Sequence, residues 1–167
     1  MVIHMNIILI GMAGCGKSTL GVLIAKALGY GFLDADLVIQ KREEKLLQEI
    51  INEKGLDYFK KAENSALCSI ECEDTVIATG GSAIYYPEAM EHLKEIGKVV
   101  WLYLPFPTIE KRIKNIKTRG IAIAPGQTLL DVYNEREPLY KKYADITIMC
   151  RGGVEDNVAQ ILRVLGK

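Results

Sequence analysis

The sequence is short of the features that mark membrane, secreted and nucleic-acid-binding proteins. No apolar run reaches the ~20 residues that a membrane-spanning helix needs. The opening residues 1–11 reach glycine too soon for a signal peptide. Lysine plus arginine equals aspartate plus glutamate, 21 each, so the formal net charge is zero and no broad basic surface is expected. We therefore expect a cytoplasmic protein with no membrane and no nucleic-acid partner.

Cross-linking and metal-ligating residues are equally sparse. The four cysteines, Cys15, Cys68, Cys72 and Cys150, form no C-x-x-C pair, and only two histidines occur. Neither a disulfide framework nor a zinc site is expected from such a pattern. The thiols are interpreted as the reduced cysteines of an intracellular protein.

The length and composition are those of one globular domain. The chain has 167 residues, of which 49% are hydrophobic and 25% charged. It contains no internal repeat, low-complexity tract or linker. We expect a single domain over residues 1–167, as a monomer or a weak dimer.

Apolar runs alternate with helical patterns along the whole chain. Strands are expected at residues 3–10, 30–33, 75–78, 98–104 and 145–150. Helices are expected at residues 17–28, 37–53, 58–71, 88–96, 108–117, 129–143 and 154–165. Residues 119–128, which contain Pro125-Gly126, are expected to be irregular. This alternation predicts an α/β fold of three layers, α/β/α, with a five-stranded parallel sheet.

A glycine-rich loop lies between the first strand and the first helix. Residues 11–18, GMAGCGKS, fit the motif G-x-x-x-x-G-K-[ST] in full. Bare backbone N–H groups and a helix N-terminus attract phosphate, Lys17 supplies a full positive charge, and the Ser18 hydroxyl suits Mg²⁺. A plain glycine-rich turn is the alternative. The residues expected to bind ATP here are Gly14, Cys15, Gly16, Lys17, Ser18 and Thr19.

Other nucleotide-dependent classes lack support. There is no N-K-x-D guanine motif and no long apolar strand that ends in Asp-Glu, as motor ATPases require. The sequence therefore predicts a small P-loop NTPase-type kinase, similar in fold to nucleoside-monophosphate kinases. It would use ATP and Mg²⁺ to phosphorylate a hydroxyl group of a small molecule.

Two aspartates follow the second strand. Asp34 and Asp36 alternate along a segment that we expect to be extended, so both would face the crevice at the carboxyl end of the sheet. The alternative is a turn in which Asp36 caps the next helix. Thr79-Gly80-Gly81 follows the next strand, as a turn or as a close backbone approach to substrate.

Taken together, these motifs resemble the shikimate kinase family over nearly the whole chain. The motifs that carry the likeness are GKST at 16–19, FLDAD at 32–36, Gly55 followed by Phe59, Lys60 and Glu63, TGG at 79–81, Arg119, and REPLY at 136–140. The resemblance implies acceptor-binding helices at about residues 37–71 and a lid at about residues 118–128. It implies shikimate as the acceptor.

The resemblance also implies a role for each matching residue. Asp34 would hold Mg²⁺ mostly through water, and Asp36 would orient or deprotonate the attacking hydroxyl. The backbone of Gly80 and Gly81 would approach the acceptor. Arginines would complete the site: Arg136 at the acceptor's carboxylate, Arg119 over the phosphates from the lid, and Arg112 against adenine. From the residues alone, Arg136 would be an exposed helical arginine, and for Arg112 an exposed helical arginine is an equal alternative.

The chain departs from the family pattern on the acceptor side. Lys60 stands where the family has arginine and loses the planar fork, although Glu63 could still hold it in place. Ser82 replaces a third glycine and could crowd the pocket or add a hydrogen bond. Leu56 replaces an acid, and the lid reads RGIA from Arg119. Another small acid or sugar acid, or a nucleotide-binding relative without shikimate activity, therefore stays open as an alternative.

Overall fold

A five-stranded parallel sheet forms the centre of the molecule. The computed structural model describes residues 5–114, 121 and 123–167. The strands are β1 (Asn6–Ile10), β2 (Gly31–Asp34), β3 (Thr75–Ala78), β4 (Gly97–Tyr103) and β5 (Ile146–Met149). Their spatial order is β2-β3-β1-β4-β5, and every neighbouring pair is parallel. Residues of β1 and β3 are buried throughout, which explains why their sequences are apolar after the first residue, Asn6 or Thr75.

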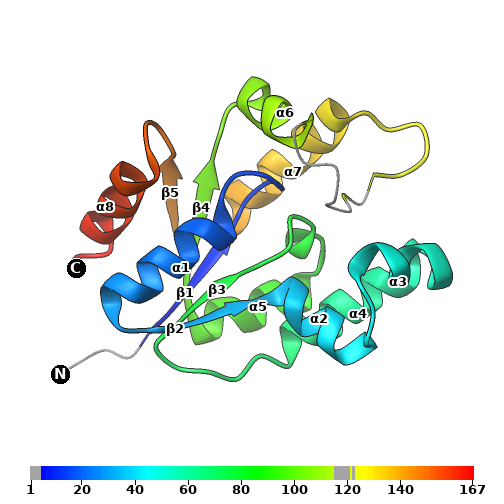
Figure 1. Cartoon of the computed structure of the whole chain (residues 1–167), viewed down its shortest axis with the longest axis horizontal. Helices are drawn as coiled ribbons and strands as arrows, with labels where there is room; N and C mark the ends of the chain where they lie inside the picture. Colours follow the sequence, from blue (N-terminus) through cyan, green and yellow to red (C-terminus); the bar gives the residue numbers. More distant parts are fainter. Residues whose placement is uncertain (1–4, 115–120, 122) are drawn as a thin grey trace.

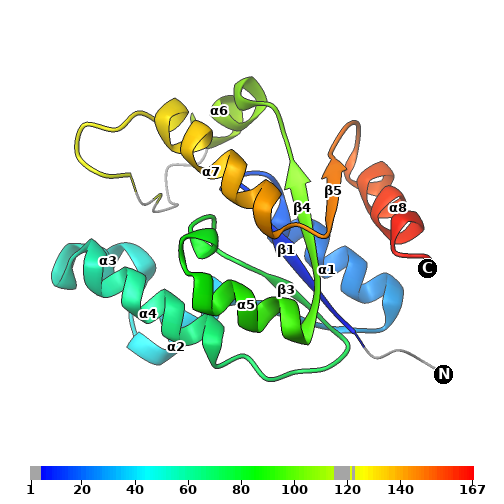
Figure 2. The same ribbon diagram turned by 180° about the vertical axis from the view of Figure 1, so that it is seen from behind.

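Helices cover both faces of this sheet. Helices α1 (Lys17–Leu28) and α8 (Val154–Val164) lie on one face (Figure 1), and α5 (Pro87–Ile96) and α7 (Leu129–Tyr143) lie on the other (Figure 2). Side chains from both layers, such as Ile24 of α1 and Leu93 of α5, are fully buried in one core with the sheet. The predicted three-layer α/β/α architecture is confirmed.

Three further helices follow β2 and project beyond the sheet (Figure 1). They are α2 (Ala35–Glu43), α3 (Leu47–Lys54) and α4 (Leu56–Cys68). Their buried residues form a second, smaller core of Ile39, Ile50, Phe59 and Ala66. The α2–α4 group is therefore packed partly on itself.

The prediction of a single helix over residues 37–53 is wrong, because the first helix ends at Glu43 and a second begins at Leu47. Glu44 adopts the left-handed conformation at φ 54°, and the backbone N–H of Lys45 donates to the Gln40 carbonyl at 3.2 Å. The new helix begins after Leu46, whose backbone N–H donates to the Glu49 carboxylate at 2.9 Å. A glutamate three residues after the cap is a helix-start signal that the continuous polar pattern concealed.

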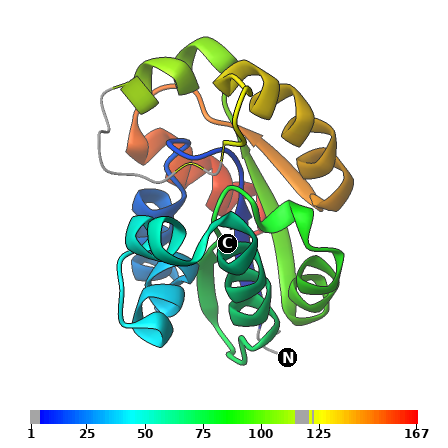
Figure 3. The ribbon, with the colours of Figure 1, turned by 90° about the vertical axis from the view of Figure 1, so that its right-hand side faces the viewer.

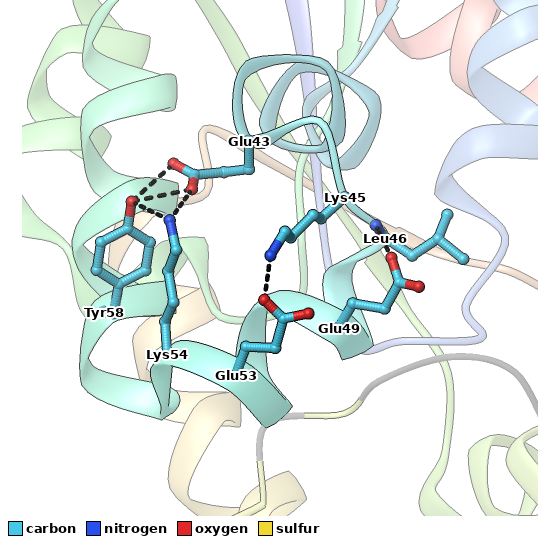
Figure 4. Close-up of polar contacts among 7 residues, drawn as sticks. All are labelled: Glu43, Lys45, Leu46, Glu49, Glu53, Lys54 and Tyr58. Carbon is cyan, nitrogen blue, oxygen red and sulfur yellow. Dashed lines mark hydrogen bonds and ion pairs between the residues drawn. The ribbon is translucent and has the colours of Figure 1, made fainter.

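Charged side chains join these three helices on their exposed side (Figure 4). The Glu43 carboxylate accepts from Lys54 Nζ at 3.0 Å and from the Tyr58 hydroxyl at 2.9 Å. Lys45 forms an ion pair with Glu53. The Glu43 cluster, defined as Glu43, Lys54 and Tyr58, thus ties the end of α2 to the end of α3 and the start of α4.

The remaining elements are a short 3₁₀ helix, η1 (Ala83–Tyr85), after β3, and α6 (Phe106–Lys114) after β4. Residues 121 and 123–128, the described part of the predicted irregular segment, contain no helix or strand. None of the helices in the described ranges is both long and apolar enough to cross a bilayer.

Candidate active site

The loop between β1 and α1 is shaped by its glycines. Gly16, the residue before α1, has φ 100°, which side-chain-bearing residues rarely adopt. At Gly11, with φ 147°, a Cβ atom would lie 2.8 Å from the Leu102 carbonyl oxygen and 2.9 Å from Cys15 Sγ. The loop can therefore wrap closely over the end of β4, and within it the Cys15 N–H donates to the Met12 carbonyl at 3.1 Å.

Lys17 lies at the base of this loop and is only 8% exposed. Its ammonium group donates to the carbonyl oxygens of Gly11 at 2.6 Å and Met12 at 2.9 Å. Cys15 is buried, with its sulfur 3.7 Å from Lys17 Nζ. The positive charge is thus held inside the loop by exchangeable backbone contacts, from which it can turn to a phosphate oxygen.

Ser18 and Asp34 form an oxygen pair at the start of α1 and the end of β2. The Ser18 hydroxyl donates to Asp34 Oδ2 at 2.7 Å. A hydroxyl and a carboxylate are the hard oxygen ligands that Mg²⁺ accepts when substrate phosphates and water complete its octahedron. The described residues hold no group of three or more His, Cys, Asp or Glu that could bind a metal alone. The pair therefore fits a magnesium ion that arrives with a phosphate ligand.

The expected extended geometry of Asp34 and Asp36 is wrong. Asp34 ends β2 and caps α2, because its Oδ1 accepts the Asp36 backbone N–H at 3.0 Å. Asp36 already lies in the first turn of α2, so it is not the cap residue of the alternative interpretation either. Asp34 prefers the cap because its side chain can reach the N–H two residues on. Both carboxylates still face one cavity.

That cavity, of about 120 Å³, joins the glycine-rich loop to the α2–α4 group. Figure 3 looks onto this side of the molecule, with α2–α4 and α6–α7 on opposite sides of the glycine-rich loop. The residues that line the cavity are Ala13, Lys17, Ser18, Asp34, Asp36, Leu47, Phe59, Glu63, Thr79, Gly80, Gly81, Ser82, Ile121 and Arg136. It therefore gathers the charged side chains of Lys17, Asp34, Asp36, Glu63 and Arg136 from four separate parts of the sequence.

Arg136 is buried, not exposed. Only 2% of it is accessible, and its guanidinium lies over the Tyr85 ring, 5.4 Å from the centroid. A Cβ at Gly81 would lie 2.9 Å from Arg136 Nη1, so glycine is needed for this approach. The Tyr140 hydroxyl donates to the Gly81 carbonyl at 2.6 Å. The reading of Arg136 as a solvated helical residue is wrong.

Glu63 turns away from Lys60, contrary to the expected pairing. Its carboxylate is 1% exposed and accepts from the Ser82 hydroxyl at 2.6 Å and the Tyr86 hydroxyl at 2.7 Å. Of the two outcomes foreseen for Ser82, the structure therefore has the added hydrogen bond. Lys60 lines an adjoining cavity of about 390 Å³, whose wall also includes Ser82 and Arg136.

The other candidates take different positions. Arg112 is on α6, beside the glycine-rich loop, and its Nη1 donates to the Gly14 carbonyl at 3.1 Å. Thr19 is exposed on the first turn of α1. Arg119 lies outside the described residues.

Sequence reasoning missed several residues of the site. Leu47 and Phe59 line the main cavity, and Tyr86 reaches Glu63 from beyond η1. The apolar pair belongs to helical patterns that look the same whether they face a core or a ligand. Tyr86 carries no local signal, since its partner is 23 residues away.

Comparisons with known proteins agree over nearly the full chain. A family model described as "Shikimate kinase" matches residues 13–166. The shikimate kinase of Aquifex aeolicus (strain VF5) is 36% identical over 159 residues, 95% of this chain and 94% of that protein. That of Persephonella marina (strain DSM 14350 / EX-H1) is 35% identical over 148 residues, 88% and 90%. The solved structure of shikimate kinase from Acinetobacter baumannii in complex with shikimate superposes with a TM-score of 0.87 at 34% identity, covering 96% and 92%.

Proposed function

The chain belongs to the shikimate kinase family, and on this premise we propose that it transfers the γ-phosphoryl group of ATP to a hydroxyl of shikimate. The predicted resemblance and the predicted P-loop kinase fold are confirmed. The assignment of individual residues is our proposal; the geometry described above supports it for the described residues, and the family resemblance alone supports it for Arg119.

One observation carries the proposal: a single cavity is lined by residues of the glycine-rich loop, its nucleotide end, and by the residues to which we assign acceptor binding, its acceptor end. Lys17 and Ser18 line the same space as Asp36 and Arg136. Phosphoryl transfer requires that the attacking hydroxyl and the γ-phosphorus meet in line, so catalysis is largely a matter of positioning and charge. A shared cavity supplies that meeting place.

On the nucleotide side, the backbone of Gly14, Cys15 and Gly16 would hold the phosphates at the N-terminus of α1. Lys17 would exchange its contacts with the Gly11 and Met12 carbonyls for the β- and γ-phosphate oxygens. Thr19 would reach the α-phosphate, and Arg112 would cover the adenine, since it already lies over Gly14.

Ser18 and Asp34 would hold Mg²⁺, Ser18 directly and Asp34 mostly through water. When bound, the ion supplies positive charge that neutralises the phosphates during transfer. The hydrogen bond between the two side chains fixes both oxygens before the ion arrives.

On the acceptor side, Asp36 would accept a hydrogen bond from the attacking hydroxyl and take up its proton as the new O–P bond forms and ADP leaves. Arg136 would grip the carboxylate of shikimate through two parallel hydrogen bonds, with Lys60 as a second positive charge. The backbone of Gly80 and Gly81 would pass close to the bound acid. Arg119 would complete the charge over the phosphates from the lid.

An ADP-release assay with purified protein tests this function. ATP and Mg²⁺ would be offered with shikimate, gluconate, homoserine and nucleoside monophosphates in parallel. We expect ADP to form with shikimate and not with the other acceptors.

Each of the other outcomes of this assay would indicate a different function for the chain. ADP formed only with another acid would keep the kinase chemistry and change the substrate. ATP binding without accelerated transfer to any acceptor would indicate a nucleotide-binding relative that has lost its activity.

A further inference from the structure

A buried hydrogen-bonded set lies behind the acceptor end of the cavity. Glu63 Oε2 accepts from Ser82 Oγ at 2.6 Å and from the Tyr86 hydroxyl at 2.7 Å. These are the short distances of hydroxyl groups that donate to a carboxylate. Neither Ser82 nor Tyr86 has a part in the transfer as described above, so the purpose of the two hydroxyls is an open question.

The second oxygen of Glu63 lies against Gly80. A Cβ atom at Gly80 would collide with Glu63 Oε1 and would stand 3.3 Å from Asp36 Oδ1. The carboxylates of Glu63 and Asp36 therefore converge on the same space beside the Cα atom of Gly80. Any movement of Glu63 would be felt by the residue that we assign to the attacking hydroxyl.

The charged and titratable groups around Glu63 come from three directions. Asp36 faces it from α2, Arg136 from α7, and Tyr86 from the segment between η1 and α5. Burial raises the pKa of the Glu63 carboxyl, and the negative charge of Asp36 adds to this rise. Hydrogen bonds from Ser82 and Tyr86 and the positive charge of Arg136 offset only part of this rise, so the pKa of Glu63 stays above its ordinary value.

We propose that Ser82 and Tyr86 are positioning residues of the transfer reaction, which hold Glu63 as a carboxylate beneath Gly80, between Asp36 and Arg136. The inference rests on the proposed function. With Glu63 ionised and fixed, its charge offsets part of the charge on buried Arg136 and keeps the guanidinium beside Gly81. With Glu63 protonated or displaced, Arg136 would lose that guide and the acceptor would bind less well.

The hydrogen bonding of Glu63 depends on Ser82, which stands where the family pattern has a third glycine. Glycine at that position would offer no hydroxyl, and the Glu63 carboxylate would have to find another partner, such as Lys60 three residues before it. Because Ser82 and Tyr86 engage Glu63, Lys60 remains directed to the adjoining cavity. The Ser82 hydroxyl thereby determines whether Glu63 pairs with Ser82 and Tyr86 or with Lys60.

The titration of Glu63 tests the inference without any enzymatic activity. Protein labelled with ¹³C at the glutamate carboxyl carbons would be titrated by NMR, with the Glu63 signal assigned by its loss in Glu63→Gln. Ser82→Ala and Tyr86→Phe each remove one hydroxyl and should raise the pKa of Glu63 by about one pH unit. Tyr85→Phe is the matched control, because the Tyr85 hydroxyl donates to Glu135 instead, and it should leave the Glu63 signal in place.

Steady-state kinetics test whether the change in the pKa of Glu63 alters the transfer reaction. The acidic limb of kcat/KM for shikimate should move to higher pH in Ser82→Ala by the shift seen in NMR, while the KM for ATP stays unchanged. Ser82→Thr retains the hydroxyl and should restore the original limb. An unchanged Glu63 titration in both hydroxyl variants, or a shifted titration with an unmoved limb, would overturn the inference. Wild-type protein inactive on shikimate would instead refute the proposed function, and the NMR titration would still report on Glu63.

Discussion

The two ends of the cavity are constructed in different ways. The nucleotide end is built mainly on one continuous stretch, residues 11–18, that offers mostly backbone groups to a ligand. The acceptor end is assembled from side chains on separate elements, with Asp36 on α2, Glu63 on α4 and Arg136 on α7. Backbone recognition is indifferent to most side chains along the loop, whereas each change on the acceptor side alters a contact. The departures from the family pattern at Lys60 and Ser82 lie at the acceptor end, where a changed side chain changes a contact.

The largest expected effect lies at the nucleotide end, at its one essential side chain. Lys17→Ala should lower kcat at least about a hundredfold, roughly 2.7 kcal/mol of transition-state stabilisation, because no backbone group can replace the ammonium charge. Steady-state ADP release measures it. Lys26→Ala, an exposed lysine on the last turn of the same helix, is the control and should retain full activity. A Lys17→Ala enzyme with normal turnover would contradict the whole site.

Asp36 provides the corresponding test at the acceptor end. Asp36→Asn should lower kcat about a hundredfold, since the amide cannot take up the proton of the attacking hydroxyl. The Kd for ATP, measured by calorimetry, should change little. Asp57→Asn, an exposed acid on α4, controls for the loss of negative charge in the α2–α4 group. Equal losses of turnover and ATP affinity would argue against an acceptor role for Asp36.

Local signals made the nucleotide end and the sheet predictable. The bounds of α1, β3 and α7 matched the expected residues 17–28, 75–78 and 129–143, because each has a signal close by in the sequence: Gly29 ends α1, Gly80 follows β3 and Thr128 caps α7. The glycine-rich loop is likewise complete within eight residues. Parallel strands that are buried on both faces have nearly continuous apolar sequences, by which they can be recognised.

Long-range contacts made the acceptor end unpredictable. Ser82 meets Glu63 across 19 residues, and the burial of Arg136 depends on how α7 packs beside Gly81. The break at Glu44 requires a left-handed backbone that a glutamate seldom adopts, so no pattern of side chains forecast it. Each of these features follows from tertiary packing, which overrides local preference.

Exchanges between arginine and lysine at residues 136 and 60 test how far the acceptor end depends on the shape of its cationic side chains. Arg136→Lys keeps the charge and loses the planar fork, so KM for shikimate should rise roughly thirtyfold, about 2 kcal/mol. Initial rates at varied shikimate measure the change, and the KM for ATP is the internal control. An unchanged KM for shikimate would show that the fork of Arg136 does not hold the acceptor.

The reverse exchange should strengthen the site. Lys60→Arg introduces a second fork into the adjoining cavity and should lower KM for shikimate about fivefold, roughly 1 kcal/mol. The same initial-rate measurement applies. Lys61→Arg, a neighbour that does not line this cavity, is the matched control. If Lys60→Arg raised KM, the lysine would be an adaptation to a different acceptor and not a weakened version of the family's arginine.

The smallest effect is expected at the Glu43 cluster, which ties together the helices of the acceptor end from outside (Figure 4). Hydrogen bonds from Lys54 and then Tyr58 lower the pKa of Glu43. A carboxyl whose pKa falls on folding stabilises the protein above its unfolded pKa, and this contribution disappears as pH falls through the folded pKa. Glu43→Gln should therefore lower Tm by about 1–2 °C near neutral pH, with the difference from wild type vanishing in strong acid and in high salt. Glu44→Gln, one residue on, is the control. A larger loss that vanished in acid would mean that the acceptor helices depend on surface charge more than on their small apolar core, whereas a loss that persisted in acid would show that the charge of Glu43 is not its source.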